Sequence, residues 1–470
     1  MPAPSDASDL DRNDIQGMAM RPYRFPAAHY HLLGVSDPAR ARRWFGGAAG
    51  RCTTVANLDA SPSLGFNVAL SWQGLSAIGT PESSLSSFPQ EFQQGMAARA
   101  DRLGDVGDSA PARWDPPFDK SVHALVVVSA MTPADRDAAS QALLSDISDN
   151  GLTALAAIDA KLLPGPDGRP VPIEHFGYRD GITQPAIEGS GEPALPGAGI
   201  PDTDGWRALK AGEFVLGQPD ETGVVPDLPA PASLSRNGSF VVLRKLHQHV
   251  FAFRDFLRRS ATDEIDVALL AAKMMGRWPS GAPLALAAER DDPALAGDPM
   301  RNNQFTYSDD LRGLNCPAGA HVRRLNPRSG LTGPNGASVH RHRLLRQGLP
   351  YGSRLPLDAT ADDGAARGAI MLLVNADIAR QFEFVQKVWI NDGDFAGLGN
   401  DKDPMIGGND GSGSFTIPRT GAPRRRLPNL PAFVSTRGGE YFFLPGIAAL
   451  RSLGGSLAVS LGVSLADTAS

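Results

Sequence analysis

Short runs of apolar and β-branched residues recur along the chain, and their length and spacing predict strands rather than long amphipathic helices. In the first half, three such strands are expected at residues 30–35, 66–72 and 121–130. Thr132, Pro133 and Asp135 then predict a helix that runs to about residue 150. Threonine is a good N-cap, proline suits the first turn, and an acidic side chain there faces the positive end of the helix dipole.

The second half repeats this mixture of strands and helices. Strands are expected at 240–246 and 369–374, and helices at 250–259, 264–276 and 378–388. Proline- and glycine-rich stretches at 163–172, 194–201 and 225–233 separate the two halves. The pattern therefore predicts an α+β fold with two sandwich units of similar size. We expect a disordered tail over 1–13, a first unit over 14–224 that includes linker segments, and a second unit over 225–470.

Composition excludes several classes of protein. With 470 residues, 42% hydrophobic and 20% charged, the chain can bury a normal core. Its net charge of -6 argues against a nucleic-acid binder, and no apolar run of about 18 residues predicts a membrane span. Two cysteines cannot build a disulfide framework, which favours a reducing compartment. The polar, acidic N-terminus shows no signal peptide, so we expect a cytoplasmic location.

Two segments carry candidate chemistry. In the first, residues 176–185, Asp180 lies between Gly177 and Gly181, where the backbone can bend close to a flat ligand. In the second, residues 316–328, His321 follows small residues and precedes three arginines. Taken singly, an Asp-Gly pair is more often a surface turn, and such a histidine is more often part of a basic loop. The nine histidines form no zinc-binding pattern.

Together the two segments resemble the dye-decolorizing peroxidase family, whose haem enzymes carry a Gly-x-x-Asp-Gly segment. Further stretches resemble the family in the same order, namely residues 213–217, 237–240, 276–281, 346–352 and 403–407. The match runs from about residue 14 to about 450, and the length resembles the longer cytoplasmic-type subgroup. The resemblance implies two ferredoxin-like units that form a dimeric α+β barrel-like sandwich, with haem b in the C-terminal half.

The resemblance also implies site residues. His321 matches the proximal ligand of the haem iron, and Asp403 matches the carboxylate that holds its other nitrogen, although Asp401 lies two residues away. Asp180 matches the distal acid/base that moves the peroxide proton. Arg346 matches the distal arginine, with Arg343 and Arg341 as near neighbours that could be confused with it.

Other positions are expected around the cofactor. Arg328, at the end of Asn326-Pro327-Arg328, matches a partner of a haem propionate, and Met371 resembles a residue of the distal lining. Three further residues are expected to line the haem edge through their backbone, namely Gly181, Ile182 and Thr183.

The activity implied is that of a peroxidase that uses hydrogen peroxide to oxidise bulky aromatic donors, dyes and phenolics, through a high-valent ferryl intermediate. Large dyes cannot reach a buried haem, so surface aromatic residues would relay electrons. Trp389 is the first candidate because it follows the helical 378–388 run near an expected exposed end, and the others are Trp278, Tyr351 and Tyr178.

Two rival functions stay open at this point. One is a haem-binding or iron-releasing carrier, which would need His321 but not Asp180 with Arg346. The other is a haem-free interaction module on the same fold. The resemblance also suggests a possible homo-oligomer, with neither nucleic acid nor membrane as a partner.

Overall fold

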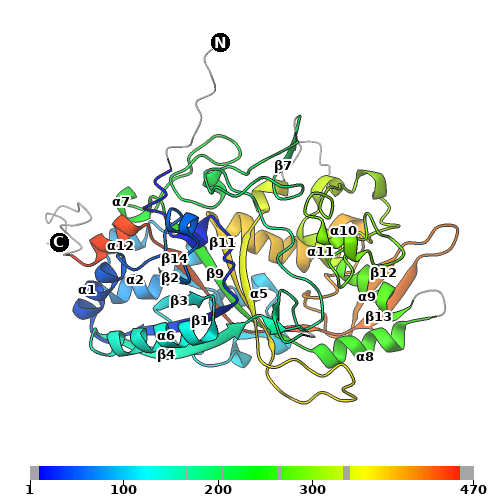
Figure 1. Cartoon of the computed structure of the whole chain (residues 1–470), viewed down its shortest axis with the longest axis horizontal. Coiled ribbons are helices and arrows are strands. Elements are labelled where there is room, and N and C mark those ends of the chain that lie inside the picture. The colour runs from blue at the N-terminus through cyan, green and yellow to red at the C-terminus, as the bar shows by residue number, and fades with distance from the viewer. Residues whose placement is uncertain (1–9, 166, 204, 263–265, 332–338, 456–470) are drawn as a thin grey trace, which may run out of the picture.

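Eight antiparallel strands form one sheet through the centre of the molecule (Figure 1). This computed structural model describes residues 10–455 apart from 166, 204, 263–265 and 332–338. The strands follow the order β10-β11-β9-β14-β2-β3-β1-β4. The four strands at one end come from the second half of the chain, and the four at the other end come from the first half.

Each half has the ferredoxin-like order of elements. In the first half these are β1 (Ala27–Val35), α1 (Pro38–Ala48), β2 (Leu64–Leu70), β3 (Ala124–Ala130), α6 (Pro133–Ser148) and β4 (Leu152–Lys161). In the second they are β9 (Ser239–Gln248), α8 (Val250–Ser260), β10 (Leu345–Tyr351), β11 (Gly368–Asn375), two π-helical segments (Ala379–Glu383 and Val385–Ile390) and β14 (Val434–Leu444). In both, the last strand is at one side of the first and the third is at the other, so the two halves repeat one topology.

Shorter elements connect these, namely α2 (Trp72–Ala77), α3 (Glu82–Leu85), α4 (Gln90–Gln94), α5 (Ala100–Leu103), β5 (Leu163–Pro164), β6 (Pro170–Val171), β7 (Ile200–Asp202), β8 (Gly205–Arg207), α7 (Ala232–Ser235), α9 (Val267–Met275), α10 (Pro293–Gly297), α11 (His321–Leu325), β12 (Gly413–Ile417), β13 (Arg425–Leu430) and α12 (Ile447–Leu453). In the part of the chain that the structure describes, no helix has the length and apolar character that crossing a bilayer requires.

Local signals explain several of these elements. The Thr132 side chain accepts a hydrogen bond from the Asp135 amide at 3.1 Å, and this cap starts α6 as predicted. Every residue of β3 is buried, which explains its continuous apolar run. The helix expected at 264–276 is α9, and the first residues of that prediction lie outside the described chain. The helix expected at 378–388 is confirmed, although it is wound as π-helix and ends at Ile390.

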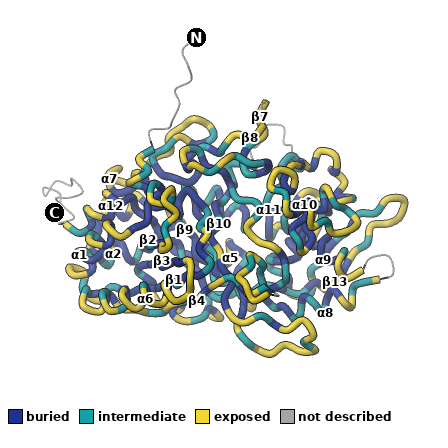
Figure 2. Tube along the Cα trace, in the orientation of Figure 1, coloured by how far each residue is buried: buried dark blue, intermediate teal, exposed yellow. Residues whose placement is uncertain are grey.

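The two units share one core. Phe443 of β14 pairs with Leu70 of β2 and joins the two halves of the sheet. A single buried cluster contains residues from both halves, and Figure 2 shows the central strands as the most buried part of the trace. The edge strands β10 and β4 approach each other, which gives the sheet its barrel-like curvature, and α12 returns to pack on α1. The predicted α+β fold class is confirmed.

The predicted divisions of the chain fall on these elements as follows. The boundary at 224/225 lies between β8 and α7, and it stays a prediction. Most of the tail expected over 1–13 lies outside the described residues. Residues 10–13 are described, and there Arg12 pairs with Asp59 at 3.0 Å.

Candidate active site

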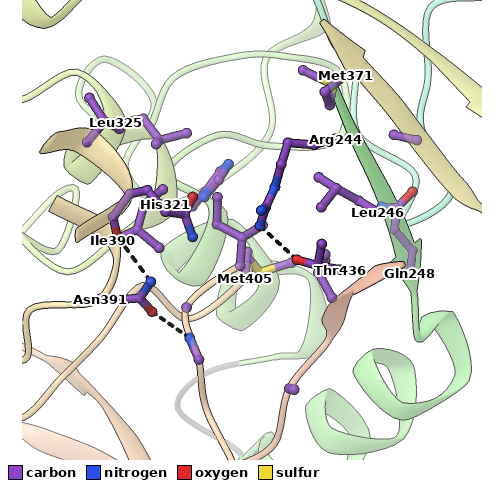
Figure 3. Close-up of a pocket in the computed structure, with 18 of the residues that line it drawn as sticks. Arg244, Leu246, Gln248, His321, Leu325, Met371, Ile390, Asn391, Met405 and Thr436 are labelled. Atoms are coloured by element: carbon purple, nitrogen blue, oxygen red, sulfur yellow. Dashed lines mark hydrogen bonds between the residues drawn. The ribbon is translucent and has the colours of Figure 1, made fainter. Parts of the chain in front are cut away.

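A cavity of about 1000 Å³ lies against the second half of the sheet. On one side it is lined by strands β9, β10, β11 and β14, which contribute Leu246, Gln248 and Met371 (Figure 3). On the other side lie α11, the second π-helical segment and the loop 402–411, which contribute His321 and Ile390. Two segments of the first half of the chain, 104–109 and 174–183, complete the wall. The site therefore needs both halves of the fold.

His321 is the first residue of α11 and is oriented by a buried carboxylate. Its Nδ1 lies 3.0 Å from Oδ2 and 3.2 Å from Oδ1 of Asp403, which has no exposed area. The amides of Met405 and Ile406 donate to the same carboxylate at 2.8 and 3.0 Å. Burial by itself would raise the pKa of Asp403, but His321, Arg324 and the Ile406 amide outweigh it, so the pKa is lowered. Asp403 is therefore an anion that fixes the imidazole ring.

Asp401 does not compete for this role. One of its carboxylate oxygens accepts a hydrogen bond from the Ser414 hydroxyl at 2.5 Å, and its backbone carbonyl accepts one from Arg324 at 2.8 Å. The structure thus brings Asp403, and not Asp401, to His321. Within the described residues, Nε2 of His321 has no hydrogen-bond partner, so it is free to bind a ligand from the cavity.

Asp180 and Arg346 meet at another part of the wall. Oδ1 of Asp180 lies 3.8 Å from Nη2 of Arg346, with 48% of the Asp180 side chain exposed. The Gly181 amide donates to Asp180 at 2.6 Å, and the positive φ of 77° at Gly181 permits the bend that places the carboxylate there. Arg346, on β10, donates to the Thr183 carbonyl at 3.3 Å. A second residue, Gln184, binds both backbone groups of Arg346 and fixes the strand against this loop.

Most of the other residues expected around the cofactor do reach the cavity, namely Gly181, Ile182, Thr183, Asn326, Arg328 and Met371. Of the two arginines that could be confused with Arg346, Arg343 lines the cavity as well. Two do not lie among its described lining residues. Pro327 instead lines a smaller cavity of about 470 Å³. Arg341 pairs with Asp220 at 2.6 Å, so it is not the arginine beside Asp180.

The expectation that Trp389 lies at an exposed helix end is wrong. Only 3% of Trp389 is exposed, because the helix packs its C-terminal turn against other aromatic residues. His342 stacks on Phe384 with ring centroids 4.0 Å apart, and Trp389 contacts both rings edge-on at 5.2 and 5.6 Å. His342 lines both cavities, so this cluster connects the smaller cavity to the larger one. The other relay candidates, Trp278, Tyr351 and Tyr178, are buried too.

Sequence reasoning missed several residues of this wall. Glu174 accepts hydrogen bonds from the amides of Phe176 and Tyr178 at 2.8 and 2.9 Å and so shapes the segment before Asp180. Arg244 forms a buried ion pair with Asp105 at 2.5 Å. Nothing local in the sequence signals these partners. The nearest thing to a signal for Glu174 is that it is an acidic residue six positions before Asp180.

Fold and site together define a class: a two-unit α+β protein with a large cavity in which a carboxylate-oriented histidine, an aspartate and an arginine converge. The family described as "DyP dimeric alpha+beta barrel domain" matches residues 51–164. The chain is 30% identical to the dye-decolorizing peroxidase msp1 of Mycetinis scorodonius over 96% of its own length and 88% of the relative's. For the dye-decolorizing peroxidase AauDyP1 of Auricularia auricula-judae, identity is 30% over 94% of this chain and 87% of the relative.

Solved structures agree. The chain is similar to an ancestral D-type dye-decolorizing peroxidase, with a TM-score of 0.82, 29% identity and coverage of 96% of this chain and 100% of that one. It is similar to a dye-decolorizing peroxidase in complex with 2,6-dimethoxyphenol, with a TM-score of 0.80, 28% identity and coverage of 95% and 100%. The chain belongs to the dye-decolorizing peroxidase family, and it is a peroxidase that oxidises aromatic substrates. Its place in a cytoplasmic-type subgroup stays a prediction.

Proposed function

We propose that the chain binds haem b in the large cavity and uses hydrogen peroxide to oxidise bulky aromatic donors such as dyes and phenolics. The observation that carries this proposal is the orientation of His321. Its Nδ1 is held by the buried Asp403 carboxylate, and its Nε2 is free beside a cavity of about 1000 Å³. A carboxylate behind a ligating histidine is the usual arrangement at metal sites, where it orients the ring and raises its basicity.

The residues present fit a haem. An imidazole is a good axial ligand of haem iron, and the apolar side chains of Leu246, Met371, Ile390 and Met405 suit the flat macrocycle. Cationic side chains on the same wall suit its two propionates, and Arg328 and Arg343 have no carboxylate partner among the described residues. A relative with a TM-score of 0.79 and 28% identity is described as having an engineered heme pocket, which supports the same assignment.

His321 and Asp403 would hold the cofactor. His321 would bind the iron through Nε2, while Asp403 accepts the Nδ1 hydrogen and keeps the ring in one tautomer. Haem, when bound, supplies the redox-active iron at which peroxide reacts. Asn326 and the backbone of residues 181–183 would line its edge. Pro327 has no such role in this proposal, because it lines the smaller cavity.

Asp180 and Arg346 would act on the peroxide. The Asp180 carboxylate can accept the proton of one peroxide oxygen and return it to the other as water leaves. Arg346 keeps a fixed positive charge beside that position and stabilises negative charge as the O–O bond breaks. Their atoms lie 3.8 Å apart without a direct hydrogen bond, so both can turn to a small molecule between them.

Bulky donors would transfer electrons from outside the haem cavity. Trp389 lines the smaller cavity, and His342 lines both cavities. We therefore propose that electrons pass from Trp389 to His342 or Phe384 and from there to the haem. A relative was solved with 2,6-dimethoxyphenol, an aromatic reductant of the expected kind. A cytoplasmic location is proposed as well, since Cys52 and Cys316 are both free thiols. A homo-oligomer is proposed on the resemblance alone.

The alternative is a haem carrier or iron-releasing protein on the same fold. Transport needs His321 but not an aspartate and an arginine placed together at the cavity wall, and the chain has both. An absorption spectrum of the purified protein, recorded with and without one equivalent of peroxide, separates these functions. The Soret band of a peroxidase changes within the mixing time when peroxide is added, and it returns to its original form when an aromatic donor is added. A carrier shows an unchanged band, and a haem-free module shows none.

A further inference from the structure

Four arginine side chains gather at one part of the cavity wall, namely Arg277, Arg328, Arg343 and Arg346. Among the described residues, a single carboxylate comes within 4 Å of any of them, which is Asp180 at 3.8 Å from Arg346. Gathering buried like charges without anions is unfavourable, because each loses its hydration and repels the others. The wall is therefore built for an anionic group that the protein itself does not supply.

Two of these guanidinium groups already donate hydrogen bonds to other groups of the protein. Arg328 donates through Nη1 to the carbonyls of Asn303 and Phe305 at 2.9 and 2.7 Å, and through Nη2 to the Asn303 side chain at 3.1 Å. Arg277 donates to the carbonyls of Gly281 and Asn302 at 2.7 and 3.2 Å, and to the same Asn303 side chain. Both arginines therefore hold loops together, with few N–H groups left to offer.

Arg343 is different. Only 7% of it is exposed, and among the described residues its side chain makes one hydrogen bond, from Nη1 to the Gly197 carbonyl at 3.5 Å, which is long for a hydrogen bond. Its Nη2 has no hydrogen-bond partner within the part of the chain that the structure describes. Burial, together with Arg328 and Arg346, lowers the pKa of Arg343 to about 9. Gly197 also touches Arg328, since a Cβ on this glycine would lie 2.9 Å from Nη2 of Arg328, so Arg343 and Arg328 flank one turn.

We infer that Arg343 is the residue that takes the carboxylate of a haem propionate, while Arg328 serves mainly to hold the Asn303 loop. This inference rests on the proposed binding of haem. It assigns the ligand by its chemistry: a carboxylate satisfies the unpaired donor of Arg343 and neutralises the excess positive charge, as charge-assisted hydrogen bonds do. It also moves to Arg343 the role that the family resemblance implies for Arg328.

The test compares haem b with its dimethyl ester, in which both propionate charges are removed. Wild type, Arg343→Met and Arg341→Gln are each loaded with either cofactor, and the rate of cofactor transfer to apomyoglobin is measured. Arg341 is the matched control, because it lies two residues from Arg343 yet pairs with Asp220. With haem b, Arg343→Met should lose the cofactor about 10- to 100-fold faster than wild type. With the dimethyl ester, the two should differ less than about twofold, since no carboxylate remains to bind.

A second readout is independent of the rate. The propionate bending band in the resonance Raman spectrum should shift in Arg343→Met and stay in place in Arg341→Gln. Two outcomes in Arg343→Met would overturn the inference. If loss of both cofactors is accelerated equally, Arg343 has a structural role, and if loss of haem b is not accelerated, Arg343 has no role in retaining the cofactor. The inference would also be overturned if Arg328→Met lost haem b faster than the dimethyl ester while Arg343→Met lost neither cofactor faster than wild type. The role of binding the propionate would then return to Arg328. If wild type takes up neither cofactor, the proposed function fails first.

Discussion

Asp180 and Arg346 stand 3.8 Å apart and each is held by a different partner. The carboxylate accepts from the Gly181 amide at 2.6 Å, and the guanidinium donates to the Thr183 carbonyl at 3.3 Å. Because neither is locked to the other, each keeps a free edge toward the cavity. This arrangement suits a small ligand such as peroxide, which would be held between a base and a fixed positive charge.

Removing either group should slow the reaction with peroxide. Asp180→Asn should keep its haem but react about 10²–10⁴-fold more slowly in stopped-flow measurements, because general acid–base help is lost. Arg346→Leu should lose about 10²–10³-fold, because charge on the breaking O–O bond is no longer compensated. The control is Asp167→Asn, an exposed position in the same half of the chain. If Asp180→Asn reacts at the normal rate, the main role passes to Arg346. Normal rates in both variants would refute the distal assignment.

The pairing of His321 with Asp403 predicts a graded effect on haem retention. His321→Ala should be purified with little or no haem, because the imidazole that would hold the iron is gone. Asp403→Asn should bind haem about 10- to 100-fold more weakly, since the ring loses its anionic partner. The ratio of Soret to protein absorbance measures both. Asp401→Asn is the matched control and should retain haem, because Asp401 contacts Ser414 rather than His321. A normal spectrum in His321→Ala would move the ligand to another histidine, first His340 or His342.

The aromatic cluster predicts a split between small and bulky donors. Trp389→Phe should slow the oxidation of bulky anthraquinone dyes and leave the first reaction with peroxide unchanged, because only the route from the smaller cavity is altered. His342→Leu should have the same effect, since His342 stacks on Phe384 at 4.0 Å and borders both cavities. Trp44→Phe, on α1 and among the lining residues of neither cavity, serves as the control. If Trp389→Phe slows both steps equally, Trp389 is a structural residue and the route is wrong.

Local sequence signals predict much of this fold and part of the candidate site. The buried strand β3 and the capped helix α6 follow from residues adjacent in sequence, and so does the bend at Gly181. The short helix α11, which begins at His321, was not predicted, and no side chain caps its first turn. Relations between distant residues did not follow. Trp389 is buried because it packs against His342 and Phe384. The periodicity of apolar residues within its own helix does not predict its contact with His342.

Long-range electrostatics were hidden for the same reason. Arg244 and Asp105 are 139 residues apart in sequence and form a fully buried pair only because the loop after α5 reaches into the second unit. The unpaired state of Arg343 could not be read from its neighbours either. It follows from the hydrogen bonds that Arg328 and Arg277 make elsewhere, and those depend on the position of Asn303.

Two buried histidines predict how stability depends on pH. His31 and His175 have 0% and 2% exposure, and Nδ1 of each has no hydrogen-bond partner among the residues that the structure describes. Burial lowers the pKa of each to about 4, from the usual 6.5. A histidine with a depressed pKa in the folded state binds protons more readily when unfolded. Its stabilising contribution is therefore complete above pH 6.5 and is lost progressively as the pH falls to about 4.

Urea unfolding of the haem-loaded protein at several pH values between 7 and 4 should therefore show falling stability, by about 1 to 3 kcal/mol for each of these histidines. His175→Gln should flatten the curve, because glutamine can still donate to the Tyr351 carbonyl, which lies 2.8 Å from His175 Nε2, but does not titrate. If stability falls with pH as steeply in His175→Gln as in wild type, His175 does not contribute to the pH dependence.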